Sequence, residues 1–413
     1  MKKFFSFIFI AFVSVQVQSQ VISELILLTQ DSSYLSSTSL FGLRVDADYY
    51  SNSVSNAFLK KMTQGGFINE ALKSSVYDQL DESNRAYARL ASDLYFYNMA
   101  DTVFPNRDWG LSLSLGARVD AQAVFSEDLF RLSFSGNKPF AGREADLSNS
   151  SGSFVQYQKV GIGLFHKKSF SGVNVSFVNG QELFSTQIDN AQLFTSNDAD
   201  SIALTYQGDA WYSDDSNRGF GVGNGAGAAI DLFWNLTLAD GNGLLMIGLQ
   251  DFGFIQWSSR TTRYSANNTF PFKGWDLEEV LDSDNPISFS SLRDSLAVEE
   301  SKEAHLTLLP ANLDLALIKK ISDKYYYKVA VRARFLEVIF PELNAGILYK
   351  PNEHLLAGAN LAYSVYGSLQ LGLSIEYIMG KTWLLQVNSN DALGTLNITE
   401  RGQSASLSIS KFF

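Results

Sequence analysis

Residues 109–125 have the sequence WGLSLSLGARVDAQAVF, in which apolar and polar side chains alternate. The odd positions are Trp, Leu, Ala, Val or Phe, whereas the even positions include Arg118 and Asp120. Successive side chains of a β-strand point to opposite sides of the sheet, so this period of two predicts a strand with one apolar face. The run is also longer than the roughly 9–11 residues that a tilted strand needs to cross a bilayer.

The same alternation recurs along most of the chain. In 325–335 the polar positions include Lys328, Arg332 and Arg334, and in 369–379 they include Glu376. We expect about 14 strands (14 to 16), and an even number places both chain ends on one side. The other segments with this pattern are 40–50, 85–99, 154–170, 172–184, 226–238, 243–257, 304–320, 342–350, 354–366, 381–389 and 403–413, with weaker ones at 188–196 and 200–212.

The connections between these segments fall into two length classes. Short turns occur at 240–243, 322–324 and 350–354, and they alternate with much longer loops. Short turns on one side and long loops on the other are typical of outer-membrane β-barrels. The long loops are 51–84, 126–153, 213–225, 258–303 and 390–402.

Two of the long loops carry further signals. Residues 67–80 have helical spacing and predict a short helical segment in an N-terminal loop, either a lid over the barrel mouth or a helix against its rim. Short helices are also expected around 275–281 and 287–296. Residues 276–303 are acidic, which indicates a solvated loop or a surface for divalent cations or a basic partner.

Composition and the N-terminus narrow the class of protein. Lys2 and Lys3 precede an apolar stretch, so 1–19 is expected to be a signal peptide and 20–413 a single barrel domain. After that stretch, no apolar run reaches the ~18 residues of a transmembrane helix. The net charge of −11 argues against a nucleic-acid partner, and the absence of Cys excludes disulfides and thiolate metal sites. The alternative is a soluble β-sandwich or propeller, which would show similar alternation; a sandwich would have its apolar faces inward.

The charged residues on the polar faces are the candidate site. Arg or Lys facing lipid near the midplane would cost ~2–4 kcal/mol each, so these residues are expected to face the lumen. They indicate either a polar, gated passage or an ion-pair network that fills the interior. The lumen-facing candidates are Arg118, Asp120, Asp231, Lys328, Arg332, Arg334 and Glu376.

The sequence offers no catalytic, cofactor or metal site. The three His are His166, His305 and His354, which are far apart and lack any HExxH arrangement. The glycine-rich residues 221–227 lack the βαβ context of a dinucleotide loop, and we expect a strand start there instead. We therefore expect no enzyme activity and no cofactor.

Five blocks of the chain form a recognisable succession: Leu132–Gly142, Gly219–Val222, Leu249–Trp257, Phe272–Leu277 and Thr307–Ala311. In this order they resemble blocks of domain-of-unknown-function family 5723, a Bacteroidota family of outer-membrane barrels. The family's Asp in "GFGVDLG" is missing here, where Gly223-Asn224-Gly225 follows. The resemblance implies a barrel whose architecture is similar to that of the long-chain fatty-acid transporters, with 14 strands and an N-terminal plug.

The last strand and the resemblance together set the functional expectations. Leu407, Ile409 and Phe413 resemble the C-terminal signal that the barrel-assembly machinery reads in outer-membrane proteins. We expect a cell outer-membrane barrel in contact with lipid, serving as a passage or binding barrel for small hydrophobic molecules. The alternative is a non-transporting component of an envelope or type IX secretion-like assembly, with an envelope protein as its unknown partner.

Overall fold

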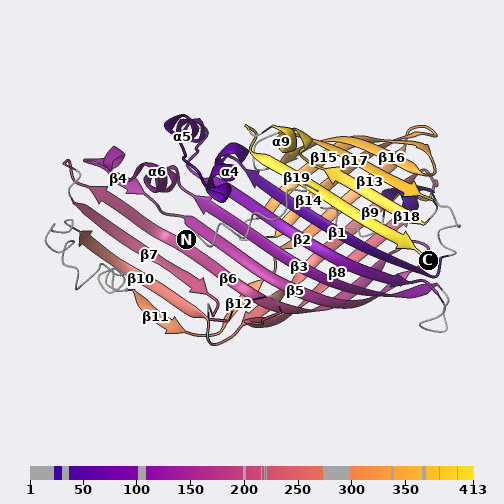
Figure 1. Ribbon diagram of the computed structural model, residues 1–413, viewed down its shortest axis with the longest axis horizontal. Coiled ribbons are helices and arrows are strands. Elements are labelled where there is room, and N and C mark those ends of the chain that lie inside the picture. The colour runs from indigo at the N-terminus through magenta and orange to yellow at the C-terminus, as the bar shows by residue number, and fades with distance from the viewer. Residues whose placement is uncertain are drawn as a thin grey trace.

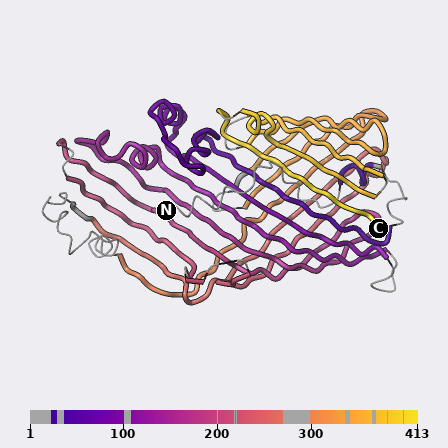
Figure 2. Tube along the Cα trace, viewed as in Figure 1, coloured from indigo at the N-terminus to yellow at the C-terminus, as the bar shows by residue number. Residues whose placement is uncertain are grey.

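A computed structural model shows that the strands form a single antiparallel sheet that closes on itself (Figure 1). The structure describes residues 23–29, 37–100, 108–198, 201–214, 216, 217, 219, 221–272, 298–335, 339–364, 369–380, 382–397 and 399–413. Closure comes from β1 (Ser39–Ser51) and β19 (Gly402–Phe412), which pair from Leu40↔Phe412 to Tyr50↔Gly402. In Figure 2 the two ends of the chain colour scale therefore lie side by side.

Fourteen strands form the closed ring, as the alternation predicted. The end at which β1 begins and β19 finishes is called the terminal end here, and the opposite end is the loop end. The ring consists of β1, β2 (Asn84–Asn98), β3 (Trp109–Phe125), β5 (Ser150–His166), β6 (Gly172–Thr195), β8 (Gly225–Thr237), β9 (Gly243–Trp257), β13 (Ala311–Lys320), β14 (Tyr325–Phe335), β15 (Ile339–Asn352), β16 (Leu355–Ser364), β17 (Leu369–Met379), β18 (Trp383–Ser389) and β19.

The apolar faces of these strands lie on the outside of the ring. Many large apolar side chains are half exposed or more, whereas the charged positions between them are buried. A sandwich would bury its apolar rows between two sheets, so the sandwich alternative is wrong. The outward residues include Leu113, Val160, Phe177, Phe252, Leu343, Leu361 and Ile375.

Beside the ring, part of the sheet extends past the loop end. Residues 172–180 of β6 pair with β8, but residues 184–195 pair with β7 (Ile202–Tyr212), which in turn pairs with β10 (Thr262–Phe272). We call residues 184–195 with β7 and β10 the overhang; it projects to the left in Figure 1. Short strands β4 (Glu144–Asp146), β11 (Glu299–Lys302) and β12 (His305–Leu308) adjoin β6, β10 and β9.

Two expectations for this region were wrong. Residues 172–184 and 188–196 form one strand rather than two, because a register shift between Ile188 and Asn190 interrupts the alternation without ending the pairing. β10 lies in a segment expected to be loop, since Asn267, Asn268 and Pro271 give it low β propensity. Pairing with β7 along its whole length stabilises it instead.

Short helices gather at the loop end (Figure 1). α5 (Glu70–Tyr77) lies within the predicted helical segment, whereas α4 (Asn56–Gln64), α6 (Glu127–Ser135) and α9 (Ala392–Leu396) lie in segments expected to be loops. Serine, asparagine or aspartate caps each N-terminus. Apolar side chains of α4, α5 and α6, among them Phe58, pack on one another and on Phe125 at the rim. Among the described residues, no helix is long and apolar enough to cross a bilayer.

Three expectations concern residues outside the described part of the chain. They are the signal peptide at 1–19, the short helices at 275–281 and 287–296, and most of the acidic loop 276–303.

Candidate functional site inside the barrel

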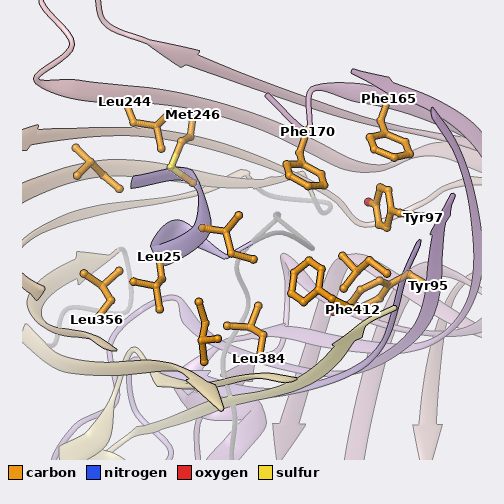
Figure 3. Packing of buried hydrophobic residues seen from close by; sticks show 14 of the residues in the cluster. Leu25, Tyr95, Tyr97, Phe165, Phe170, Leu244, Met246, Leu356, Leu384 and Phe412 are labelled. Atoms are coloured by element: carbon orange, nitrogen blue, oxygen red, sulfur yellow. The ribbon is translucent and has the colours of Figure 1, made fainter. Parts of the chain in front are cut away.

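A short helix, α2 (Glu24–Thr29), lies inside the terminal end of the barrel. Leu25 is fully buried and faces apolar side chains from several strands, including Leu356, Leu384 and Phe412 (Figure 3). With the rest of that cluster, these side chains fill the terminal end. An apolar helix of six residues is too short to show helical periodicity, so no local pattern predicted this helix.

Two of the predicted residues anchor α2 to the wall. The Leu25 amide donates to Glu376 Oε2 at 2.8 Å, and the Ser23 hydroxyl donates to the same oxygen. Lys328 forms an ion pair with Glu24. Glu376 on β17 and Lys328 on β14 thus both hold the N-terminal segment against the wall.

A larger ionic cluster surrounds Asp251 of β9, whose side chain is fully buried. Its carboxylate pairs with Arg89 at 2.9 Å, Arg118 at 3.1 Å and Lys159 at 2.6 Å. These cations belong to β2, β3 and β5, which are not neighbours of β9 in the ring. Side chains from non-adjacent strands can meet only in the interior, so the Asp251 cluster lies in the lumen and fills it between β2 and β9.

Further acids complete the Asp251 cluster. Asp231 accepts from Lys159 at 2.8 Å and from the Asp251 backbone amide at 2.7 Å. Asp120 lies 3.4 Å from Arg89, and Asp93 accepts from Arg118 at 2.8 Å. Three of the predicted residues, Arg118, Asp120 and Asp231, therefore come together in one cluster.

Asp251 was not among the predicted residues, and its backbone explains why. Inward positions of β9 are even up to Gln250 but odd from Gly253 onward, because the register with β8 shifts between Ile230 and Leu232. Asp251 occupies this bulge with φ of 55°, in the left-handed region that Asp adopts more readily than most residues. Simple alternation would have pointed it outward. Arg89 and Lys159, by contrast, lie on the polar faces of predicted strands, where the same rule would have found them.

A second group of charges lies across β13, β14, β15 and β1. Arg332 pairs with Asp314 at 2.6 Å and lies 3.7 Å from Glu342. Arg334 lies 3.7 Å from Glu342 and 3.9 Å from Asp48. The acids of this group were not predicted, because their strands were recognised by their apolar faces.

Small cavities adjoin these groups. A cavity of about 60 Å³ is lined by Glu24, Lys328 and Arg332 together with small residues of β13–β17, and it has room for a few water molecules. A cavity of about 20 Å³ lies beside Arg118 and Asp231. Away from the apolar terminal end, charged side chains therefore occupy much of the lumen.

The described residues bring no group of metal ligands together. They hold no cluster of three or more His, Cys, Asp or Glu suited to a metal ion. His166 lies against Ser169, His305 stacks on Trp211, and His354 lies in a terminal-end turn, so the three are well separated.

The fold and its interior define the class as a closed 14-stranded β-barrel with an apolar outer surface and a charged interior. The chain belongs to the DUF5723 family, a family of unknown function, whose model matches residues 28–385. No curated protein matches its sequence.

Several solved barrels are similar in fold. A deltaS2S3 mutant of the monoaromatic hydrocarbon channel TodX is 11% identical, with 95% of each chain covered and a TM-score of 0.42. The Ralstonia pickettii toluene transporter TbuX is 9% identical, with 92% of this chain and 91% of that chain covered and a TM-score of 0.41. The KdgM porin is 9% identical over 65% of this chain and 95% of that chain, with a TM-score of 0.25.

Proposed function

We propose that this chain is an outer-membrane β-barrel whose lumen is closed, and that it works through its loop end as a non-transporting component of an envelope assembly. Membrane insertion is supported by the apolar outer surface and by the closed ring, which leaves no strand edge without hydrogen-bond partners in lipid. Export, lipid contact and assembly by the barrel-assembly machinery belong to this proposal, and so does the absence of catalysis.

We infer the closed lumen mainly from the Asp251 cluster. Its side chains reach from β2, β3 and β5 to β9 and are at most 5% exposed, apart from Asp93 at 14%. A hydrophobic molecule moving along the barrel axis would have to pass this cluster on one side of the lumen or the Arg332 and Arg334 group on the other, and an ion would have to break their pairs. α2 closes the terminal end independently.

Single-barrel conductance in planar bilayers tests the proposal. We expect no steady conductance from the wild-type protein. A Glu376→Ala, Lys328→Ala variant, which loosens α2 alone, should also stay closed because the Asp251 cluster remains. Stable open channels in the wild type would contradict the closed lumen, and recovery of the protein outside the outer-membrane fraction would contradict its placement.

A passage for small hydrophobic molecules is the second candidate, and the apolar terminal end favours it. Tyr95, Tyr97, Phe165 and Phe170 lie there close to Phe412, in the same cluster as Leu25 of α2 (Figure 3). A hydrophobic ligand that displaced α2 would meet apolar surroundings. Mass spectrometry of the purified barrel distinguishes the two, because a retained apolar molecule released on denaturation favours the passage.

A further inference from the structure

The overhang has two unlike faces. On one face, Leu193, Leu204 and Tyr206 pack against Phe140 and Ala145 from the segment between β3 and β5. This face is covered by the chain itself. The opposite face contains Trp211, which packs against the inner residues of the barrel, so this face continues the inner surface of the barrel wall.

The second face carries an array of polar side chains, bordered at its outer end by Phe194 and Ala203. Strand register places the polar side chains in four rows across β6, β7 and β10. Neighbouring strands are ~4.8 Å apart and successive rows ~6.8 Å apart, except at the register shift between Ile188 and Asn190, which separates the second row from the third. The rows are Gln192–Thr205–Thr269, Asn190–Gln207–Asn267, Gln187–Asp209–Ser265 and Ser185–Trp211–Arg263.

The outer part of this array is exposed and uncharged. Gln187, Asn190, Gln192, Gln207, Asn267 and Thr269 are all exposed. The array's only charges are Asp209 and Arg263, which pair at 2.8 Å, and Glu303 lies a further 3.5 Å from Arg263. Asp189, at the bulge of β6, borders the array and accepts from Gln187 at 3.4 Å, so one cation faces three carboxylates and the surface is weakly acidic.

At the end of the array nearest the barrel, the Trp211 ring is covered by a histidine ring and a guanidinium group. The His305 ring lies 3.9 Å from the Trp211 ring at an interplanar angle of 19°, and the Arg263 guanidinium lies 5.2 Å from the Trp211 ring. A ligand therefore has access to the amide and hydroxyl rows rather than to the indole faces.

From this geometry we propose that the array binds a soluble, neutral oligosaccharide. Each amide supplies both donors and acceptors and each hydroxyl supplies both, which matches a ligand made of hydroxyl groups. An acidic ligand would lose hydration and meet three carboxylates against one guanidinium, and an apolar ligand would leave the amides unpaired. This site goes beyond the proposed function and does not require a closed lumen.

Calorimetric titration of the purified barrel tests the site, in a detergent without a sugar head group. The probes are cellohexaose, xylohexaose, maltohexaose and mannohexaose, with hexagalacturonate as the acidic counterpart. We expect saturable binding of at least one neutral probe and weaker binding of the acidic one. The double variant Gln207→Ala, Asn267→Ala should weaken that binding at least tenfold.

Asn268→Ala is the matched control. Asn268 is exposed like Asn267 and is its neighbour in sequence, but it pairs with Tyr206 and so lies on the other face. It should bind as the wild type does, and a heat-modifiability gel shows that each variant is folded. Absence of binding by all neutral probes, tighter binding of hexagalacturonate, or an equal loss in Asn268→Ala would overturn the proposal.

Discussion

Between β2 and β9 the lumen is filled by ion pairs, whereas between β13 and β18 small residues surround its larger cavity. The first side leaves a cavity of about 20 Å³ and the second one of about 60 Å³. We call them the dense side and the hollow side. Long charged side chains from several strands meet on the dense side, while Ala316, Ala330, Gly346 and Gly358 on the hollow side cannot reach across.

The difference indicates a division of roles between the two sides. A buried ion pair fixes the geometry of its two groups. Loss of one partner destabilises the folded protein strongly, because the other charge stays buried without a counter-charge. Substitutions on the dense side should therefore lower the free energy of unfolding more than substitutions on the hollow side.

The largest effect is expected from Asp251→Ala. The substitution leaves Arg89, Arg118 and Lys159 short of a buried counter-charge, which costs about 3–5 kcal/mol. Urea unfolding of the barrel in lipid vesicles measures it. Asp240→Ala, in an exposed turn, should change the free energy of unfolding by less than ~0.5 kcal/mol. If Asp251→Ala fails to assemble, Asp251→Asn is measured instead, and wild-type stability there would refute the role of the charge.

The second-largest effect on the free energy of unfolding is expected from an Ala→Val substitution, which adds two methyl groups, made once on the dense side and once on the hollow side. Ala229 is 1% exposed and packed among inner apolar residues of the dense side, so Ala229→Val should cost about 1–3 kcal/mol by overpacking. Ala330 lines the larger cavity, so Ala330→Val should change the free energy of unfolding little. Equal costs in the same urea measurement would remove the distinction between the two sides.

Loosening α2 should have a smaller effect. The chain has no Cys, so Leu25→Cys provides a single thiol inside the terminal end. In that background Glu376→Ala removes the acceptor of the backbone amide of residue 25. Loss of this hydrogen bond to a charged group costs about 1.5 kcal/mol, which predicts roughly tenfold faster labelling of the thiol by a maleimide. Glu353→Ala, at an exposed turn of the same end, should leave the labelling rate unchanged. An unchanged rate in Glu376→Ala would show that apolar packing alone holds α2.

The smallest effect concerns pH at the loop end of the hollow side. Burial of Asp391, the N-cap of α9, raises the pKa of its carboxyl from 3.8 to about 6. Because the folded pKa is the higher one, the stabilisation is complete below about pH 3.8 and is lost as the pH rises through 6. Asp391→Asn should flatten the pH dependence of unfolding between pH 4 and 7 by about 1 kcal/mol after solvent screening. An identical pH profile in the variant would contradict this assignment.

Much of the fold could be predicted because alternation is a local property. A row such as that of Trp109–Phe125 specifies a strand and its two faces without reference to any other part of the chain. The seven predicted charges followed from that rule, and the structure places each of them among buried or half-buried charged groups. Alternation could not identify the partners of these charges, because residues that pair in the structure, such as Arg118 and Asp251, are far apart in sequence.

The sequence by itself determined most of the strands and the residues that share each face, because a period of two is written residue by residue. Only the tertiary structure decided the closure of the sheet, the inward turn of Asp251, the position of α2 and the polar array of the overhang. The facing of Asp251 and the rows of the array depend on register between strands, since one extra residue reverses the facing of all that follow. Closure and the position of α2 depend on contacts between residues far apart in sequence, such as those of β1 with β19 and of Leu25 with Glu376.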